Sequence, residues 1–366
     1  MMKVVVAMSG GVDSSVAAAL LKDQGYEVIG ITMKLQPSNQ KAGETNRFGG
    51  CCGIGAITDA QKVARRLGIP HYVVNFRDIF AQHVIANFCH EYRLGRTPNP
   101  CIRCNQYIKF DALLRRAREL GADTVATGHY ATIVNVHERY NLRKSTDQRK
   151  DQTYFLYTMI QEQLEHSLFP VGGLTKAEVR RIAEKLELPV VDKPESQEIC
   201  FIPDNDYARF LEEYTGSAAT PGYIIDRQGN VIGKHRGITS YTIGQRKGLG
   251  IASQEPLYVT SIDPEENTIT VGEKNEAYAT GLIASDLNWI SVEKQDGPTN
   301  VKAKIRHLHR EAEATVTPAS TGKVVVEFRE PQMAPAPGQA VVFYDGDVVV
   351  GGGTIARVVS TRGMEQ

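Results

Sequence analysis

Near its N-terminus the chain reads Lys3-Val4-Val5-Val6-Ala7-Met8, continues directly into Ser9-Gly10-Gly11-Val12-Asp13-Ser14-Ser15, and then runs to Gln24 through a stretch rich in Ala and Leu. The apolar run predicts a buried strand, and residues 15–24 predict a helix. Free backbone N–H groups and the positive end of the helix dipole would therefore face whatever binds beyond the strand. The two glycines allow close approach of a ligand, and the serines add hydroxyl donors. This stretch predicts a phosphate site.

Two common phosphate loops are excluded. The sequence has no G-x-x-x-x-G-K-[ST], so the lysine that such loops place on the β- and γ-phosphates is missing. No G-x-G-x-x-G follows the first strand, so a dinucleotide site is not indicated. Residues 9–15 instead resemble the PP-loop of the ATP pyrophosphatase superfamily, whose members cleave ATP to AMP and pyrophosphate and adenylate an oxygen of their substrate. The alternative interpretation is an ordinary Gly/Ser-rich turn between a strand and a helix.

Strand-like and helix-like segments alternate over roughly the first 145 residues. Further strands are predicted at 27–33, 71–75 and 124–127. Continuous apolar strands separated by helices indicate an α/β fold with a doubly wound parallel sheet. Ligands of such sheets bind beyond the carboxyl ends of the strands. Residues 9–15, Met33 and Gly128 follow such ends, so we expect them to meet at one nucleotide.

The predicted secondary structure changes from about residue 152 onward. Residues 152–214 read as mostly helical, with 176–188 the clearest helix, and from about Gly222 short Val-, Ile- and Tyr-rich runs alternate with turn residues. These runs predict β-hairpins that end in a small barrel. We therefore expect a catalytic domain at 1–204, a central β-rich domain at 205–278 and a C-terminal β-barrel at 279–366.

The amino-acid composition limits the classes of protein to which this chain can belong. The 42 basic and 42 acidic residues give a formal net charge of zero, which argues against a histone-like binder but allows a local basic face. No apolar run approaches the ~20 residues that span a bilayer. The N-terminal stretch, with its short strand and no small-residue cleavage site, is not expected to be a signal peptide. We expect a cytoplasmic protein without a membrane partner. Clusters of basic residues occur at Lys144, Arg149 and Lys150, at Arg115, Arg116 and Arg118, and at Lys302, Lys304, Arg306, His307, His309 and Arg310.

The cysteines are Cys51, Cys52, Cys89, Cys101, Cys104 and Cys200. A disulfide framework is not expected in a cytosolic protein. Cys101 and Cys104 have C-x-x-C spacing within 95–110, where two prolines predict an exposed, stiff loop, and nearby cations favour the thiolate. A zinc site would need a second ligand pair at the right spacing, which is lacking. Cys51 and Cys52 are interpreted as structural, with an unassigned role as the alternative, and Cys89 as a core residue.

Seven longer motifs follow one another along the chain. They are Ser9–Ser15, Asn99–Phe110, Thr127–Tyr130, Lys150–Leu156, Ser196–Phe201, Tyr241–Gly250 and Pro337–Gln339. Together they resemble the tRNA-specific 2-thiouridylases, the MnmA/TrmU family, over nearly the whole chain. The resemblance implies replacement of the C2 oxygen of wobble uridine 34 in tRNA by sulfur. ATP would adenylate that oxygen, and a cysteine persulfide, charged by a sulfur-donor protein, would supply the sulfur.

The resemblance also implies roles for particular residues. Cys200 would carry the persulfide and Cys104 would be its partner nucleophile, forming a disulfide with it. Asp13 would help to place Mg²⁺ or act as a base. The ATP site would comprise Ala7, Met8, Ser9, Gly10, Gly11, Val12, Asp13, Ser14, Met33 and Gly128. The tRNA contacts would comprise Asn99, Pro100, Cys101, His129, Lys150, Asp151, Gln152, Arg306, His307 and Gln339.

One position departs from the family pattern. The family usually has Asn-Pro-Asp where this chain has Asn99-Pro100-Cys101. The extra thiol suggests a second hypothesis, in which Cys101, Cys104 and Cys200 bind an iron–sulfur cluster with one open iron, although four cysteines are the common count.

Two other classes of function are alternatives to thiolation. The first is a PP-loop synthetase that adenylates a small metabolite, which would need neither the cysteine pair nor the barrel. The second is a non-catalytic tRNA- or metal-binding protein with a vestigial loop, against which the intact Ser9–Ser15 motif argues. Release of pyrophosphate with and without tRNA separates all three.

Overall fold

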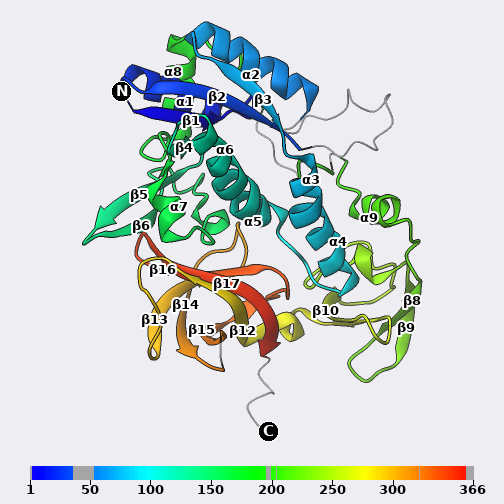
Figure 1. Cartoon of the computed structure of the whole chain (residues 1–366). Coiled ribbons are helices and arrows are strands. Elements are labelled where there is room, and N and C mark those ends of the chain that lie inside the picture. The colour runs from blue at the N-terminus through cyan, green and yellow to red at the C-terminus, as the bar shows by residue number, and fades with distance from the viewer. Residues whose placement is uncertain (1, 36–52, 195–198, 203, 321, 360–366) are drawn as a thin grey trace. The chain divides into compact units, whose positions relative to one another are not determined.

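The computed structural model describes residues 2–35, 53–194, 199–202, 204–320 and 322–359 (Figure 1). Cys51, Cys52 and residues 196–198 of the motif before Cys200 lie outside this set. The chain divides into two compact units, each described by itself. The first comprises Met1–Ile85, Pro100–Asn205 and Asp347–Val349, and the second comprises Ala86–Asn99, Asp206–Gly346 and Val350–Gln366. The division at 204 and 278 stays a prediction.

A parallel sheet forms the centre of the first unit, as predicted. Its order is β3-β2-β1-β4-β7, and all its neighbouring strands run parallel. The strands are β1 (Lys3–Ala7), β2 (Glu27–Lys34), β3 (His71–Asn75), β4 (Thr124–Ala126) and β7 (Ser167–Leu168). Val4, Val5 and Val6 in the middle strand are fully buried. Because helices cover both faces of such a sheet, an unbroken apolar run suits its central strand.

Helices cover the sheet on both faces, with α2 (Ile54–Leu67) on one side and α6 (Leu113–Glu119) on the other (Figure 1). The helix α1 (Val12–Asp23) begins directly after the Gly-Gly pair, and α8 (Lys176–Lys185) contacts it. Val16 and Leu21 of α1 share one buried cluster with Val179 of α8. This packing fixes the first residue of α8 close to the first turn of α1.

The stretch predicted as an exposed loop at 95–110 is helical from Pro100 onward, so that prediction was wrong. A short helix, α5 (Pro100–Cys104), leads into the π-helical η2 (Asn105–Ala112) and then α6. Proline lacks an N–H and has a fixed φ, both of which suit the first position of a helix. Pro100 therefore starts this helix instead of preventing it, and Cys104 is buried.

Other elements of the first unit are short. They are α3 (Arg77–Phe80), the π-helical η1 (Ala81–Ile85), the 3₁₀ turn η3 (Thr153–Phe155), α7 (Gln161–Glu165) and the hairpin of β5 (Ala131–Val136) and β6 (Arg139–Lys144). The hairpin was not predicted. Its turn residues, His137 and Glu138, both have positive φ although neither is glycine. Arg143 of β6 pairs with Val348.

The second unit contains a small sheet of order β10-β11-β8-β9. Its strands are β8 (Gly222–Ile225), β9 (Val231–His235), β10 (Tyr258–Asp263) and β11 (Thr268–Gly272), and nearby are α4 (Ala86–Arg93), α9 (Tyr207–Thr215), η4 (Ile238–Ser240) and η5 (Lys274–Ala277). Ile224, Val259 and Ile269 are fully buried between its elements. This is the β-rich region predicted from the short apolar runs.

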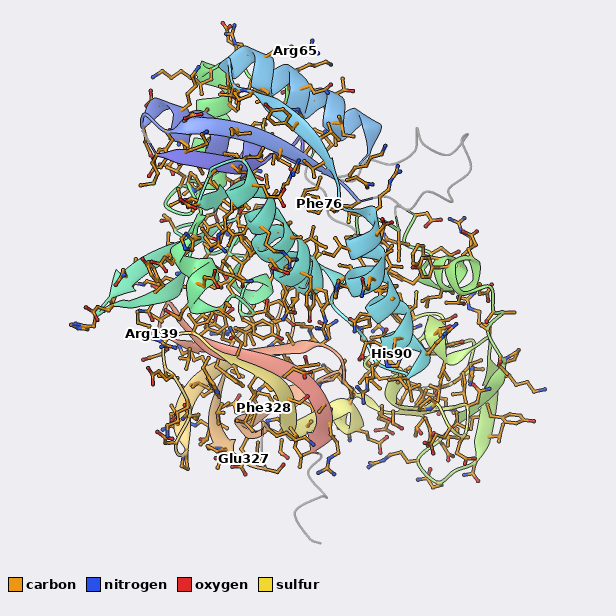
Figure 2. The ribbon with its side chains drawn as sticks, viewed as in Figure 1. Arg65, Phe76, His90, Arg139, Glu327 and Phe328 are labelled. Carbon is orange, nitrogen blue, oxygen red and sulfur yellow. The ribbon has the colours of Figure 1, made fainter. Side chains whose placement is uncertain are left out.

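The predicted barrel is present in the second unit. Its strands are β12 (Tyr278–Trp289), β13 (Thr299–Lys304), β14 (Ala312–Pro318), β15 (Val324–Met333), β16 (Ala340–Asp345) and β17 (Val348–Val359). They follow the order β12-β15-β14-β13-β16-β17, and pairing of β12 with β17 closes the ring. Neighbouring residues alternate between core and solvent: Phe328 is buried and Glu327 is exposed, both labelled in Figure 2. Among the described residues, no helix is long and apolar enough to cross a membrane.

Candidate active site

The loop after β1 is held by its own hydroxyl groups. Ser14 Oγ and Ser15 Oγ donate to the Gly11 carbonyl oxygen at 3.2 and 2.8 Å, and Ser9 Oγ lies 3.2 Å from Ser14 Oγ. Gly10 has a φ of +69°, and a Cβ there would lie 2.3 Å from the carbonyl oxygen of Ala56. The loop therefore needs glycine at this position, and it opens onto the first turn of α1 as an anion site would.

A cavity of about 370 Å³ lies within the first unit, beside this loop. Its walls include nine of the ten residues expected to bind ATP: Ala7, Met8, Ser9, Gly11, Val12, Asp13, Ser14, Met33 and Gly128. They also include Pro100, Cys101, Cys104, His129, Lys150, Gln152 and Cys200. Residues separated by almost 200 positions thus line one cavity, which includes residues predicted for nucleotide binding and residues predicted for sulfur chemistry.

Asp13 projects into this cavity with two partners. Tyr130 Oη donates to Asp13 Oδ1 at 2.8 Å, and Lys176 Nζ lies 2.6 and 2.8 Å from its two carboxylate oxygens. The Lys176 side chain is 11% exposed and its ammonium lies 5.9 Å from the centre of the Tyr130 ring. Neither partner was singled out from the sequence, because each is remote from Asp13 along the chain.

A second lysine at the cavity wall also contacts the loop. Lys193 Nζ donates to the carbonyl oxygen of Gly10 at 3.0 Å and pairs with Asp59 Oδ2 at 2.7 Å. Gly10 does not line the cavity; its carbonyl faces Lys193 instead. The sequence alone gave no signal for this contact, which joins the loop, α2 and the segment after α8.

Gly128 stands where the end of β4 approaches the loop most closely. A Cβ at this position would lie 2.5 Å from the Ser14 nitrogen and 2.6 Å from the Asp13 carbonyl carbon. Because those contacts are with backbone atoms, a side chain could be accommodated only by moving the loop. Gly128 therefore positions the loop in addition to lining the cavity.

His129 is a buried, neutral group at the cavity wall. Its Nδ1 lies 2.6 Å from Thr127 Oγ1 and its Nε2 lies 3.3 Å from Lys109 Nζ. Burial, and secondarily the charge of Lys109, hold the pKa of His129 well below its usual range. A neutral imidazole can accept a hydrogen bond from the ammonium group, so Lys109 and Thr127 together fix the ring.

The three cysteines at the cavity differ in exposure. Cys104, at the end of α5, is buried, Cys101 is exposed, and Cys200 is intermediate. Phe201 packs edge-on against Phe80 with ring centres 5.6 Å apart, which anchors the segment that carries Cys200. Among the described residues, no group of three or more Cys, His, Asp and Glu side chains is arranged to hold a metal ion.

The remaining predicted contacts lie outside this cavity. Asp151 is buried, and its carboxylate accepts hydrogen bonds from Ser145 N and Thr153 Oγ1. Asn99, Arg306, His307 and Gln339 belong to the second unit. There, Arg306 donates to the Met333 carbonyl oxygen and Gln339 to that of Pro98, at 3.3 and 3.4 Å.

The basic cluster at 115–118 is largely neutralised. Arg115 pairs with Asp111, Arg116 with Glu119 and Arg118 with Glu162. Surface pairs of this kind reduce the local positive field. Within the first unit, Lys109, Lys150, Lys176 and Lys193 line the cavity instead. Two of these lysines, Lys176 and Lys193, also pair with carboxylates, those of Asp13 and Asp59, so pairing reduces their field as well.

Comparison with known proteins places the chain in a family. Three family descriptions match in series: "tRNA methyl transferase HUP domain" at residues 2–204, "tRNA methyl transferase PRC-barrel domain" at 208–273 and "Aminomethyltransferase beta-barrel domain" at 279–355. The chain is 56% identical over 356 residues to the tRNA-specific 2-thiouridylase MnmA of Acetivibrio thermocellus, covering 96% of this chain and 99% of that protein. The same-named protein of Clostridium perfringens is 53% identical over 357 residues, covering 98% and 99%. That of Symbiobacterium thermophilum is 54% identical over 362 residues, covering 98% and 93%.

Proposed function

Because the chain belongs to the tRNA-specific 2-thiouridylase family, we propose that it replaces the C2 oxygen of wobble uridine 34 in tRNA with sulfur at the cost of one ATP. The observation that carries this proposal is the shared cavity: the phosphate loop, Cys104 and Cys200 line the same space. An oxygen activated at the loop is thus within the space that the thiols face. Methyl transfer, which two of the matching family descriptions name, would use neither feature.

The reaction has two stages. In the first, the C2 oxygen attacks the α-phosphorus of ATP, pyrophosphate leaves, and the uridine carries an AMP group. In the second, the terminal sulfur of a Cys200 persulfide attacks C2 and AMP leaves. The Cys104 thiolate then attacks the Cys200 sulfur, releases 2-thiouridine and forms a Cys104–Cys200 disulfide. An external thiol must reduce this disulfide, and a sulfur-donor protein must restore the persulfide, before the next cycle.

The loop residues are suited to holding the triphosphate. The N–H groups at the start of α1 supply donors, and Gly10, Gly11 and Gly128 leave room for a ligand against the backbone. Ala7, Met8, Met33 and Leu35 give the cavity an apolar wall for the adenine ring. Carboxylate oxygens are ligands that Mg²⁺ favours, so Asp13 fits a role in holding the ion, which would neutralise charge on the phosphates. Asp13 contacts one cation, Lys176, and one hydroxyl donor, Tyr130, so its carboxylate oxygens are already engaged, which favours the ion-holding role over a base role.

The residues proposed to contact tRNA are those that the family resemblance implies. Pro100, Cys101, His129, Lys150 and Gln152 line the cavity and are proposed to receive the target base and its neighbours. Asp151, by contrast, uses its carboxylate inside the protein, so we propose that it supports this segment and contacts RNA through its backbone. Asn99, Arg306, His307 and Gln339 are proposed to contact tRNA from the second unit.

An iron–sulfur version of the same thiolation is the second candidate. Its support is that Cys101, Cys104 and Cys200 all line one cavity, although among the described residues their side chains are not arranged to hold a metal ion. The open iron of such a cluster would bind an exogenous sulfide. The test is anaerobic purification, reconstitution, and analysis of iron and acid-labile sulfide. Absence of bound iron after reconstitution would exclude this version.

Pyrophosphate release tests the main proposal. The purified chain is supplied with ATP and Mg²⁺, with and without unmodified tRNA that has uridine at the wobble position. Release that tRNA stimulates supports the proposal. Release that needs a small metabolite instead would support a different synthetase, and no release under any condition would indicate a non-catalytic protein. A tRNA with cytidine at the wobble position is the matched control.

A further inference from the structure

We propose that Lys176 is the residue that neutralises the β- and γ-phosphates of ATP in this site, moving between Asp13 and the phosphates as the nucleotide comes and goes. This inference rests on the proposed function, because it assumes that ATP binds at the loop. The loop at 9–15 contains no lysine, unlike nucleotide loops that carry their own phosphate-binding lysine. The fold supplies one from α8, 163 positions away from Asp13.

The position of Lys176 is strongly determined. Its backbone N–H donates to Asp147 Oδ2 at 3.0 Å, and it is the first residue of α8, directly after the helix cap. Thr175 and Glu178 form a reciprocal capping box around it. An ammonium group at the end of a side chain whose backbone is fixed in this way can exchange partners within the cavity without movement of the helix. Figure 1 shows α8 beside α1, where this exchange would occur.

Charge explains why an exchange is needed. Asp13 and the phosphate loop line the same cavity, so the Asp13 carboxylate would repel an incoming triphosphate. Lys176 compensates the carboxylate in this structure, with contacts to its two oxygens at 2.6 and 2.8 Å. A divalent cation held by Asp13 would take over this compensation and leave the ammonium of Lys176 for the phosphates, for which lysine is a suitable point charge.

Lys193 does not fill this role, although it also lines the cavity. Its ammonium pairs with Asp59 at 2.7 Å and donates to the Gly10 carbonyl oxygen at 3.0 Å. Lys193 therefore connects the carbonyl oxygen of Gly10 in the loop to Asp59 in α2. Lys176, in contrast, has its carboxylate partner on the loop residue that is expected to bind the cation.

The experiment measures equilibrium binding of inorganic pyrophosphate, of a non-hydrolysable ATP analogue with Mg²⁺, and of AMP. The variants are Lys176→Met, Lys176→Arg and, as a matched control on the same helix, Lys185→Met, whose side chain is exposed. Lys176→Met should weaken binding of pyrophosphate and of the analogue roughly ten- to a hundredfold. AMP, which lacks the β- and γ-phosphates, should bind to all variants within about threefold of the unaltered chain. Lys176→Arg should retain most of the affinity.

A double variant separates direct contact from mere support of Asp13. Asp13→Asn removes the carboxylate, and without a metal ion it should strengthen pyrophosphate binding because the repulsion is gone. If Lys176 contacts phosphate itself, Lys176→Met must still weaken pyrophosphate binding in the Asp13→Asn background. If that second substitution has no effect there, Lys176 is a structural partner of Asp13 and the inference is overturned. Thermal melting of each variant verifies that it is folded.

Failure of this inference is distinguishable from failure of the proposed function. If the unaltered chain binds the ATP analogue and Lys176→Met binds it and pyrophosphate equally well, only the role of Lys176 is wrong. If the unaltered chain binds neither ATP nor pyrophosphate, the proposed adenylation is wrong and this inference falls with it.

Discussion

Tyr130 Oη donates a 2.8 Å hydrogen bond to Asp13 Oδ1, across 117 positions of sequence. The tyrosine is 3% exposed, and its backbone exchanges hydrogen bonds with Gln152. The bond therefore connects a rigid part of the first unit to the carboxylate at the phosphate loop. Its effect is to hold Asp13 in one orientation while Lys176 compensates its charge.

Replacing Tyr130 with Phe should test that orientation directly. The ring and its packing remain, while the donor to Asp13 is lost, at a cost of about 1 kcal/mol in the free energy that orients the carboxylate. We expect tRNA-stimulated pyrophosphate release to fall several-fold and the Mg²⁺ concentration for half-maximal activity to rise. The melting temperature should change little. Unchanged magnesium dependence would show that the hydroxyl does not orient Asp13.

Gly128→Ala should weaken nucleotide binding because the new side chain displaces the backbone of the loop. The new Cβ would meet the Ser14 nitrogen at 2.5 Å, so the loop must shift. Affinity for the ATP analogue should fall by roughly tenfold or more, since a misplaced anion site loses charge-assisted hydrogen bonds. Gly173→Ala is the control, because a Cβ there meets no atom within 4 Å. Equal affinities for the two variants would contradict the close approach.

Single substitutions should distinguish the cysteines that take part in thiolation from one that does not. Cys104→Ser and Cys200→Ser should each abolish thiolation while tRNA-stimulated pyrophosphate release and tRNA binding persist, because adenylation precedes sulfur transfer. Cys89→Ala is the control. Burial raises the pKa of the Cys89 thiol to about 11, partly offset by Arg93, so it stays protonated and unreactive at neutral pH. Thiolation by Cys104→Ser at the unaltered rate would exclude its role in releasing the product.

Binding of tRNA should weaken steeply as salt rises, because phosphate contacts release counterions. Lys150→Gln should reduce the slope of log affinity against log salt by about one if this cavity-lining lysine contacts a phosphate. Arg118→Gln should change the slope less, because Arg118 already pairs with Glu162 at 2.8 Å. Affinity that does not depend on salt would argue against an RNA-binding surface. The measurement is a titration with labelled tRNA at several salt concentrations.

Stability should fall as pH falls from about 6.5 to about 4, in part because of two histidines in the second unit. Burial, and secondarily Lys304, lowers the pKa of His307 to about 4; burial, then Arg306 and Lys304, lowers the pKa of His309 to about 4. Their pKa is near 6.5 in the unfolded chain, so in this window the unfolded state binds more protons and stability rises with pH. Above pH 6.5 the contribution is fully present.

The double variant His307→Gln, His309→Gln checks this assignment. Its unfolding free energy, measured with denaturant at several pH values, should fall less steeply between pH 6.5 and 4 than that of the unaltered chain. His71 and His129, whose pKa values burial also lowers, remain and retain part of the slope. An identical slope for both proteins would mean that the two histidines do not titrate differently on folding.

Much of the fold could be predicted because its signals are local. The run Lys3–Met8, the Gly-Gly turn and the helix that follows are contiguous, and their periodicity and turn chemistry lie within a few residues. The hairpin at 131–144 was missed because its turn uses His137 and Glu138 at positive φ, where glycine or asparagine would have signalled it. Pro100 was misinterpreted because the same residue interrupts a helix in its interior and favours one at its first position.

The parallel sheet, the Gly/Ser-rich loop after β1, the order of the motifs and the positions of the cysteines could all be inferred from the sequence. The surroundings of Asp13 became known only from the packing of the folded chain. Lys176, Tyr130 and Lys193 stand 117 to 183 positions from their partners on the loop. A strand or helix signal arises from neighbours along the chain, whereas compensation of a charge depends on distance in space, which is set by the packing of α8 against α1.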